Sequence, residues 1–253
     1  MGQRLVALGS ADPGLQIVAA LDRPGHPRLG DDAGSIAGVG SLGVPLADKL
    51  SVPVDAMIDF SVPAGSISAL EKCLAARVPL VLATTGFSPE QSEQIRAAAN
   101  GLALLWAPSM SLAVNLAMKL TAVAAEALKD HPSGADVEII ERHHRFKEDS
   151  PSGTALKFGE IVAGKMGQSA ARHGREGRPG ARPHGEIGYH AVRTGDNPGE
   201  HTIIFGLLGE SLEINVRATN RDCYAHGALA AAKFLAGKPA GLYGMNDVLG
   251  LGK

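Results

Sequence analysis

The chain has 253 residues, of which 45% are hydrophobic and 20% are charged, a composition typical of a soluble globular protein. The formal net charge is −2, from 24 basic and 26 acidic residues, so no general positive field would attract nucleic acid or an anionic membrane. The two cysteines, Cys73 and Cys223, lack Cys-x-x-Cys spacing, which argues against a disulfide framework or a zinc site. No segment approaches the roughly 18 apolar residues of a membrane span, and we expect a cytoplasmic protein.

The first elements of the chain are those of a nucleotide-binding fold. Residues 2–8 have the pattern of the end of a helix, and residues 16–21 are a strand candidate followed directly by Asp22 and Arg23. In dinucleotide-binding domains, an acid at this position bonds the ribose 2′-hydroxyl and an adjacent arginine can hold a 2′-phosphate. The pair therefore suggests use of both NADH and NADPH. The alternative is an ordinary exposed Asp-Arg pair at the start of a loop.

No glycine-rich loop of the G-x-G-x-x-G kind precedes Asp22. The pyrophosphate of a dinucleotide normally rests on such a loop at the N-terminus of the first helix. We therefore expect the first strand and most of the phosphate loop to be missing from this chain. Two explanations are open: a start codon assigned too late, which the local consistency of the remaining sequence favours, or a real truncation.

Three further strand candidates, residues 56–60, 80–83 and 103–106, alternate with helices predicted at 63–76 and 88–99. This alternation is typical of a doubly wound parallel sheet. The loops after the last two of these strands offer backbone and hydroxyl groups at one sheet edge, where α/β proteins bind ligands. The predicted cofactor contacts from these two loops are Ala83, Thr84, Thr85 and Gly86, and Ala107, Pro108, Ser109 and Met110.

The next segment carries the most informative motif. A helix is predicted at 115–129, a strand at 136–141 and a helix at 154–166, and between the last two lies HHRFKEDSPSGTA at 143–155. A helix N-terminus has unsatisfied N–H groups and a partial positive charge, so a carboxylate can rest on Gly153 and Thr154. Basic side chains would close over it, and His143 and Lys147 would move protons. We predict a site for an anionic substrate.

Two other interpretations of this cluster are less favoured. In the first, the basic residues form a solvated face and residues 150–154 only cap a helix. In the second, the histidines bind a metal, but neighbouring residues of an extended segment point to opposite sides, and Arg145 and Lys147 would repel a divalent cation. The position of the cluster at the carboxyl end of a strand favours a binding site without a metal.

The remaining elements predict a second, mixed sheet. Residues 173–184 (HGREGRPGARPH) have the composition of a mobile loop. Strand candidates follow at 187–193, 201–207 and 211–217, separated by turn signals, and we expect antiparallel pairs in one sheet with the strand at 136–141. The last helix is predicted at 223–236.

Together these residues resemble the 4-hydroxy-tetrahydrodipicolinate reductase family, also called dihydrodipicolinate reductase, of the diaminopimelate and lysine pathway. His-His-Arg-x-Lys followed by Ser-Gly-Thr is the most specific part of the match. The matching segments are ALDRPG at 20–25, IDFSVP at 58–63, ATTGF at 83–87, residues 111–115, EIIERHHRFKEDSPSGTA at 138–155, Arg193 with Gly195 and Gly199-Glu200-His201, and Leu249. There are two departures: Met1-Gly2 corresponds to the tail of the family's Gly-Arg-Met-Gly loop, and Phe146 stands where histidine is frequent.

The resemblance implies roles for the residues of the motif. His143 would be the proton donor and acceptor, and Lys147 a second proton donor. The implied substrate contacts are His144, Gly153 and Thr154. A dicarboxylate substrate fits this set, because it needs several N–H donors and cations.

The resemblance also implies the architecture and the partners. The fold would be α/β, with a Rossmann-like doubly wound nucleotide domain at residues 1–114 and 221–253. An α+β domain at 115–220 would bind substrate and form a homotetramer through its mixed sheet. The implied cofactor is NADPH or NADH, with Asp22 and Arg23 at its adenosine ribose and Arg221 as a further contact. We expect no metal, nucleic acid or membrane partner.

Three hypotheses for the activity follow. The main one is an NAD(P)H-dependent reductase that converts the cyclic product of aspartate semialdehyde and pyruvate to tetrahydrodipicolinate and water. The second is a catalytically silent relative that keeps the oligomer and the dicarboxylate site but binds no cofactor, because the missing strand is central in the doubly wound order. The third is a general dehydrogenase of hydroxyl or aldehyde substrates, with no strict need for Lys147.

Overall fold

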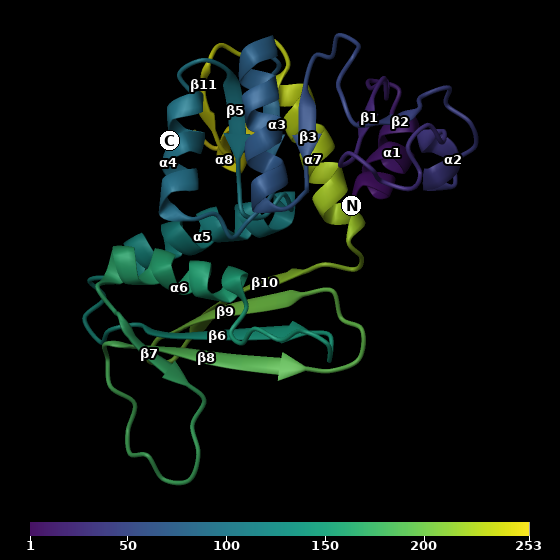
Figure 1. The fold of residues 1–253 in the computed structure, drawn as a ribbon. Coiled ribbons are helices and arrows are strands. Elements are labelled where there is room, and N and C mark those ends of the chain that lie inside the picture. Colours follow the sequence, from purple (N-terminus) through teal and green to yellow (C-terminus); the bar gives the residue numbers. More distant parts are fainter. Residues whose placement is uncertain (253) are drawn as a thin grey trace. The chain divides into compact units, whose positions relative to one another are not determined.

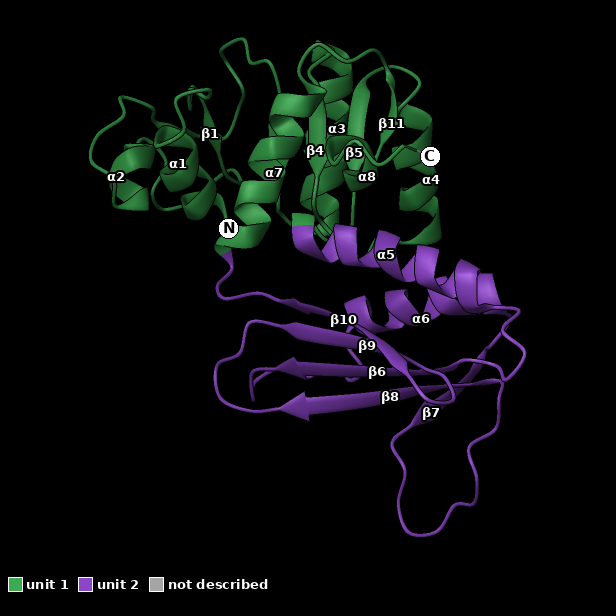
Figure 2. Cartoon of the chain, turned by 180° about the vertical axis from the view of Figure 1, so that it is seen from behind, with its two compact units in different colours: residues 1–112, 222–253 green, residues 113–221 purple. Residues whose placement is uncertain are grey.

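The computed structural model describes residues 1–252, and the chain divides into two compact units (Figure 2). Unit 1 comprises Met1–Leu112 and the chain from Asp222 onward, and unit 2 is Ala113–Arg221. The two crossings therefore fall at 112/113 and 221/222, where the sequence suggested 114/115 and 220/221. Among the described residues, no helix is both long and apolar enough to cross a membrane.

Unit 1 combines short parallel strands with helices (Figure 1). Its strands are β1 (Ala20–Leu21), β2 (Leu46–Ala47), β3 (Met57–Asp59), β4 (Leu80–Leu82), β5 (Ala103–Trp106) and β11 (Gly241–Tyr243). Its helices are α1 (Gly2–Ser10), α2 (Ala33–Ala37), α3 (Pro63–Ala76), α4 (Pro89–Ala98), α7 (Asp222–Leu235) and α8 (Met245–Val248). Helix α4 begins with a capping box, in which Ser88 and Gln91 bond each other's backbone N–H.

The main sheet of unit 1 is doubly wound. Its strand order is β11-β5-β4-β3, and all its pairings are parallel. Side chains of successive residues alternate between the two faces. Val81 and Leu105 pack in one core with α7, whereas Leu82 and Leu104 pack in another with α3 and α4. The sequence expectation of helices on both faces of a parallel sheet is confirmed.

The start of unit 1 differs from the expectation. Strands β1 and β2 pair with each other in a separate two-stranded sheet, so the parallel strands do not form one continuous sheet. Of the strand predicted at 16–21, only Ala20–Leu21 is a strand. These two residues pair with β2, whereas residues 16–19 have no neighbouring strand among the described residues to complete a ladder.

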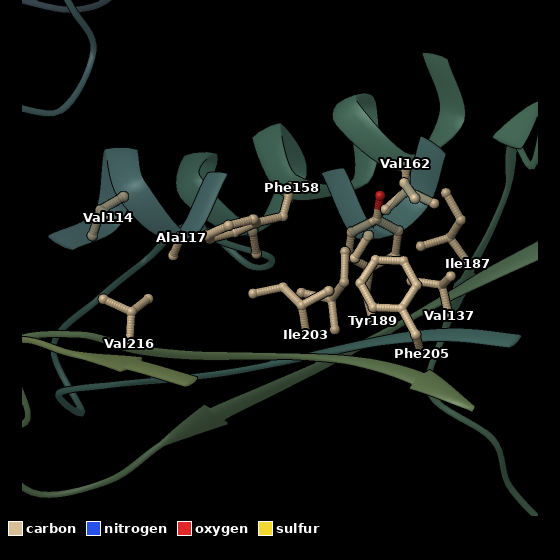
Figure 3. Close-up of a cluster of buried hydrophobic side chains, with 14 residues drawn as sticks. Val114, Ala117, Val137, Phe158, Val162, Ile187, Tyr189, Ile203, Phe205 and Val216 are labelled. Carbon is tan, nitrogen blue, oxygen red and sulfur yellow. The ribbon is translucent and has the colours of Figure 1, made fainter. Parts of the chain in front are cut away.

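Unit 2 is a mixed sheet covered on one face by helices. Its strands are β6 (Asp136–His143), β7 (Ala170–His173), β8 (Glu186–Arg193), β9 (Glu200–Gly206) and β10 (Ser211–Arg217), in the order β10-β9-β6-β8-β7. Helices α5 (Leu112–Leu128) and α6 (Gly153–Met166) pack on it. Figure 3 shows the core between them, where Phe158 and Val162 of α6 face Ile203 and Phe205 of β9.

The pairing of the mixed sheet corrects one prediction. Strands β9 and β10 are antiparallel as expected, but β8 is parallel to β6 and does not pair with β9. Strand β6 lies between them, antiparallel to β9. The connection from β6 through α6 is long enough for a crossover, which gives parallel strands. The loop at 194–199 spans the two strand spacings from β8 to β9, about 10 Å.

Strand β7 was not predicted, because Ala170–His173 contains no β-branched or aromatic residue and every side chain in it is exposed. It pairs only with β8, at the edge of the sheet.

Candidate active site

The end of β6 carries two buried ionisable side chains on the same face of the strand. Glu141 and His143 are two residues apart, and side chains at this spacing point the same way. Their exposed fractions are 1% and 9%. His143 Nδ1 lies 2.6 Å from Glu141 Oε2. The strand thus presents a buried histidine already bonded to a carboxylate.

Glu141 is also held by the neighbouring strand and by α6. Arg193 of β8 donates from its two terminal guanidinium nitrogens to the carboxylate, from Nη1 at 2.8 Å to Oε2 and from Nη2 at 2.7 Å to Oε1. The backbone N–H of Ser152 donates to Oε1 at 3.1 Å. Burial disfavours the charge, but the hydrogen bonds from Arg193 and His143 outweigh it and lower the pKa of Glu141. The carboxylate is therefore charged at neutral pH.

His143 sits in a balance of opposing effects. Burial lowers its pKa, Glu141 raises it, and the nearby cations Lys147 and Arg193 lower it again, so that the net pKa is below its usual range. The neutral ring predominates at pH 7. A negatively charged ligand placed beside the ring would favour the protonated form.

A second buried histidine lies against the first. The ring centroids of His143 and His201 are 5.3 Å apart in an edge contact, and Phe158 packs on His201 at 5.8 Å. Burial lowers the pKa of His201 to about 4, and its Nδ1 has no partner among the described residues. His201 is therefore neutral at physiological pH. On the other side, Gly199 has φ +149°, and a Cβ there would lie 3.0 Å from His143 Nε2.

The loop after β6 holds the remaining basic residues. Lys147 Nζ lies 2.6 Å from Asp149 Oδ1. The backbone oxygen of Asp149 accepts a bond from Arg193 at 2.7 Å, which ties this loop to the Glu141 cluster. His144 is half-buried, and its Nδ1 is buried without a partner among residues 1–252. The loop thus keeps Lys147 in the same charge cluster as His143.

Helix α6 begins beside this cluster. Ser152 is its N-cap, and its Oγ accepts the N–H of Ala155 at 3.2 Å. The N–H groups of Gly153 and Thr154 have no acceptor within the described part of the chain. Free N–H groups at the start of a helix attract an anion. The structure therefore brings together His143, Lys147 and the α6 N-terminus, as the sequence predicted.

The two predicted cofactor loops of unit 1 follow strands β4 and β5, which are parallel neighbours in the sheet. Thr84, after β4, is buried, and its Oγ1 donates to Asp59 Oδ2 at 3.0 Å and lies 3.3 Å from the Ser61 carbonyl oxygen. The Ser66 hydroxyl also bonds to Asp59. A single carboxylate thus fixes the ends of β3 and β4 and the first turn of α3. The next residues are open: Thr85 and Gly86 are exposed, and Gly86 has φ +80°.

The loop after β5 lies at the same edge. The N–H of Ala107 donates to the Leu82 carbonyl at 3.3 Å, and Met110 is buried, whereas Pro108 is exposed and Ser109 is half-buried. Helix α7 approaches this loop closely, because a Cβ on Gly227 would lie 1.7 Å from the Met110 oxygen. The loop is therefore held by packing on one side and open on the other.

Trp106 ends β5 and forms an edge contact with Phe87, at 5.9 Å between ring centroids. The Arg96 guanidinium lies 5.7 Å over the indole ring. This single tryptophan is therefore near the residues that follow both β4 and β5.

The other predicted cofactor residues are not joined to these loops. Asp22 follows β1 in the separate two-stranded sheet, and its Oδ1 accepts the N–H of Arg23 at 2.8 Å. Both side chains are exposed. Arg221 is exposed at the end of unit 2. Among the described residues, no hydrogen bond or ion pair connects Asp22 or Arg23 to the β4 and β5 loops. No group of three or more His, Cys, Asp or Glu side chains in residues 1–252 could hold a metal ion.

Sequence reasoning gave no role to Glu141, Arg193, His201 or Asp59. Glu141 carried a usable signal, since it lies two residues before His143 in a predicted strand and must share its face. Arg193 and His201 are opposite His143 and Glu141 in the sheet, and this depends on a strand pairing that the sequence did not reveal.

Comparison with known proteins identifies the family. The family model described as "Dihydrodipicolinate reductase, N-terminus" matches residues 1–110, and the model described as "Dihydrodipicolinate reductase, C-terminus" matches residues 113–249. A 4-hydroxy-tetrahydrodipicolinate reductase from Rhodopirellula baltica is 55% identical over 99% of this chain and 92% of its own length. The enzyme of the same name from Methylococcus capsulatus is 46% identical over 99% of this chain and 94% of its own length.

Solved structures agree with this match. A dihydrodipicolinate reductase from Paenisporosarcina sp. TG-14, with dipicolinate bound, is 27% identical and has a TM-score of 0.77 over 96% of this chain and 92% of its own. An amine dehydrogenase from Mycobacterium smegmatis shares the fold at 15% identity, with a TM-score of 0.64 over 96% of this chain and 91% of its own. The chain belongs to the dihydrodipicolinate reductase family.

Proposed function

We propose that this chain is a 4-hydroxy-tetrahydrodipicolinate reductase that converts its substrate to tetrahydrodipicolinate and water with a nicotinamide cofactor. The observation that carries the proposal is the arrangement of His143 and Lys147 beside the free N–H groups of Gly153 and Thr154. Relatives matched over almost their whole length carry the name of this enzyme. They give no support to the second hypothesis, a silent relative that binds no cofactor.

The proposed substrate contacts are groups that donate hydrogen bonds to the negative charges of a dicarboxylate. One carboxylate would accept the N–H groups of Gly153 and Thr154, at the positive end of α6. His144 would donate to the same substrate from its ring. The Paenisporosarcina relative binds dipicolinate, a planar dicarboxylate of this class, which supports the proposal.

His143 would accept and donate the reaction proton. The free enzyme holds its ring neutral, and the negative substrate would raise its pKa, so that a proton enters with the substrate. Reduction of the ring leaves an electron-rich carbon next to the reduced position, and His143 would protonate it. Lys147, now paired with Asp149, would be the second donor.

The residues of unit 1 fit a nicotinamide cofactor. When bound, the cofactor supplies the hydride. The exposed Gly86 has no atom within 4 Å of its missing Cβ, which leaves room for a ligand to approach the backbone. The proposed contacts in unit 1 are Ala83, Thr84, Thr85 and Gly86, then Ala107, Pro108, Ser109 and Met110, together with Asp22 and Arg23. Arg221, the last residue of unit 2, is proposed as a further contact on the family resemblance alone.

We propose that the enzyme uses both NADH and NADPH as cofactors. Asp22 would accept the ribose 2′-hydroxyl of NADH, and the exposed Arg23 would hold the 2′-phosphate of NADPH. Neither side chain forms an ion pair shorter than the 3.9 Å contact between Asp22 and His26, so both are available.

A cytoplasmic homotetramer formed through the mixed sheet is part of the same proposal. The sheet face opposite α5 and α6 carries Ile140, Val192 and Ile204, and Val192 is exposed. An apolar group on an uncovered sheet face supports an interface there. Sedimentation of the purified chain would test the subunit number.

The test of the function is substrate-dependent oxidation of NADPH by the wild type and by Lys147→Ala. Loss of a proton donor should lower kcat about 100-fold. Lys165→Ala, an exposed lysine on α6 that pairs with Glu126, is the matched control and should keep full activity. Unchanged turnover of Lys147→Ala would favour a general dehydrogenase instead.

A further inference from the structure

We propose that Glu141 and Arg193 are positioning residues that hold the proton of neutral His143 on Nδ1 and leave Nε2 to exchange a proton with the substrate. The inference rests on the proposed function, because it concerns the same reaction. No feature of the family motif assigned a role to either residue.

The bonds of Glu141 dictate which histidine nitrogen carries the proton. An ionised carboxylate can only accept hydrogen bonds. Its two oxygens lie 2.6 to 3.1 Å from His143 Nδ1, from the two terminal guanidinium nitrogens of Arg193 and from the backbone N–H of Ser152. His143 Nδ1 must therefore be the donor. In a neutral ring, Nε2 is then the unprotonated nitrogen.

The surroundings of Nε2 are open to a reacting group. This atom has no hydrogen-bond partner among the described residues. A side chain at position 199 would crowd it, because a Cβ would lie 3.0 Å away, and the residue there is Gly199. Nε2 is therefore the nitrogen available for proton transfer.

The other groups that act on the ring favour its neutral form or are themselves neutral, and the carboxylate of Asp149, in the same loop, is paired with Lys147. Lys147, from the loop after β6, and Arg193, from β8, both lower the pKa of His143, and His201, from β9, is neutral because its own pKa is about 4. Glu141, which bonds the ring directly, favours the imidazolium. The carboxylate is thus the group that lets His143 gain a proton when the substrate arrives.

Glu141 also links the proton donor to the anion site. The carboxylate that orients His143 accepts the N–H of Ser152, which directly precedes Gly153. A shift of α6 would move this bond, so His143 and the N–H groups proposed for the substrate carboxylate keep one relative position. Such fixed geometry is what proton transfer requires.

The first test measures the proton position in the unsubstituted enzyme and does not depend on turnover. Nitrogen-15 NMR of histidine-labelled enzyme distinguishes the two neutral tautomers, and a His143→Gln spectrum assigns the signal. We expect the Nδ1–H tautomer in the wild type above the pKa of His143. A signal showing the Nε2–H tautomer would overturn the proposal.

The second test is the pH dependence of kcat/KM for Glu141→Gln. We expect a loss between about 100-fold and about 10⁴-fold, the upper figure being the loss in a serine protease whose catalytic histidine is deprived of its orienting carboxylate. If protonated His143 is the active form, removal of the negative charge lowers its pKa and moves the basic limb of the profile about one unit toward lower pH. A purely structural role would reduce activity or stability without moving this limb, and an unmoved limb would contradict the proposal.

Glu138→Gln is the matched control. Glu138 lies on the same strand and also bonds two arginines and a histidine, Arg175, Arg182 and His190, but on the opposite face. Its replacement should leave the basic limb unchanged. The proposed function can fail separately: if His143→Gln kept full activity, the reaction would not use His143, whatever its tautomer.

Discussion

The two units hold their candidate functional residues in different ways. In unit 2, one buried carboxylate, Glu141, bonds a histidine, an arginine and a helix N-cap, so hydrogen bonds on several sides fix the candidate site. In unit 1, Asp59 fixes Thr84 in a similar way, but the following residues Thr85 and Gly86 are exposed. The candidate catalytic residues are thus held by hydrogen bonds, whereas the proposed cofactor contacts of unit 1 lie on open loops and next to two separate sheets.

This difference predicts where substitutions act. Changes in the Glu141 cluster should lower kcat and leave cofactor affinity unchanged. Changes in the loops of unit 1 should alter cofactor affinity, by smaller factors than the changes in kcat. The reason is that the cofactor would be bound through several contacts, each of which contributes little to the affinity.

The largest effect is expected for His143→Gln. Removal of the proton-transfer group should lower kcat/KM about 1000-fold, while the affinity for NADPH stays the same. His131→Gln, an exposed histidine in the loop before β6, is the control. Steady-state kinetics combined with an NADPH titration would make the comparison. A parallel loss of NADPH affinity would contradict the expectation that substitutions in the Glu141 cluster leave cofactor binding unchanged.

The buried His201 should make the stability depend on pH. Its folded pKa of about 4 is below the ordinary value of 6.5, so the unfolded chain binds a proton first as the pH falls. The contribution of His201 to the free energy of unfolding is complete above pH 6.5 and is lost as the pH falls from 6.5 to about 4. Between pH 7 and pH 5 the loss should be about 2 kcal/mol.

Urea unfolding at these two pH values would measure the loss. His201→Gln carries no titrating group and should remove most of the pH dependence, even if it lowers stability at both pH values. An equal slope in the variant would assign the pH dependence to other groups. The carboxylate of Glu141, whose pKa is lowered, adds a further loss only below its unfolded value, near pH 4.5.

Gly199→Ala should disturb His143 directly. The new Cβ would lie 3.0 Å from Nε2 and would occupy a backbone conformation, φ +149°, that favours glycine. We expect kcat/KM to fall roughly 10-fold through displacement of the ring. Gly209→Ala has the same kind of backbone strain, at φ +91°, with no atom near its Cβ, and should keep its activity. Equal activities of the two variants would show that the ring has room to adjust.

The smallest effect is expected for Arg23→Ala. Loss of the exposed guanidinium should weaken NADPH binding about fivefold and leave NADH binding unchanged, since only NADPH carries the 2′-phosphate. Isothermal titration with each cofactor would measure the ratio. An equal loss for both cofactors would place Arg23 away from the 2′ position.

The sequence predicted elements that have strong local signals. Helix α3 begins at Pro63 and strand β10 spans Ser211–Arg217, at the bounds that the pattern suggested. The sequence did not predict β7, which has no residue typical of strands, or the parallel pairing of β8 with β6. Pairing depends on contacts between distant segments, and periodicity does not report such contacts.

The candidate site divides in the same way. His143, Lys147 and Gly153 belong to one continuous motif and were visible in the sequence. The anchors of that motif were not, because Arg193 is 52 residues from Glu141 along the chain and meets it only through β-sheet pairing. The roles of all these residues remain predictions for the experiments above.

The most direct measurement is a titration of the purified chain with NADPH, followed by the fluorescence of Trp106. This is the only tryptophan in the chain, and it ends β5 beside the residues proposed to contact the cofactor. Saturable quenching at micromolar NADPH is expected, and it would show that the open loops of unit 1 bind cofactor as proposed. A folded protein whose fluorescence did not respond would contradict the cofactor site.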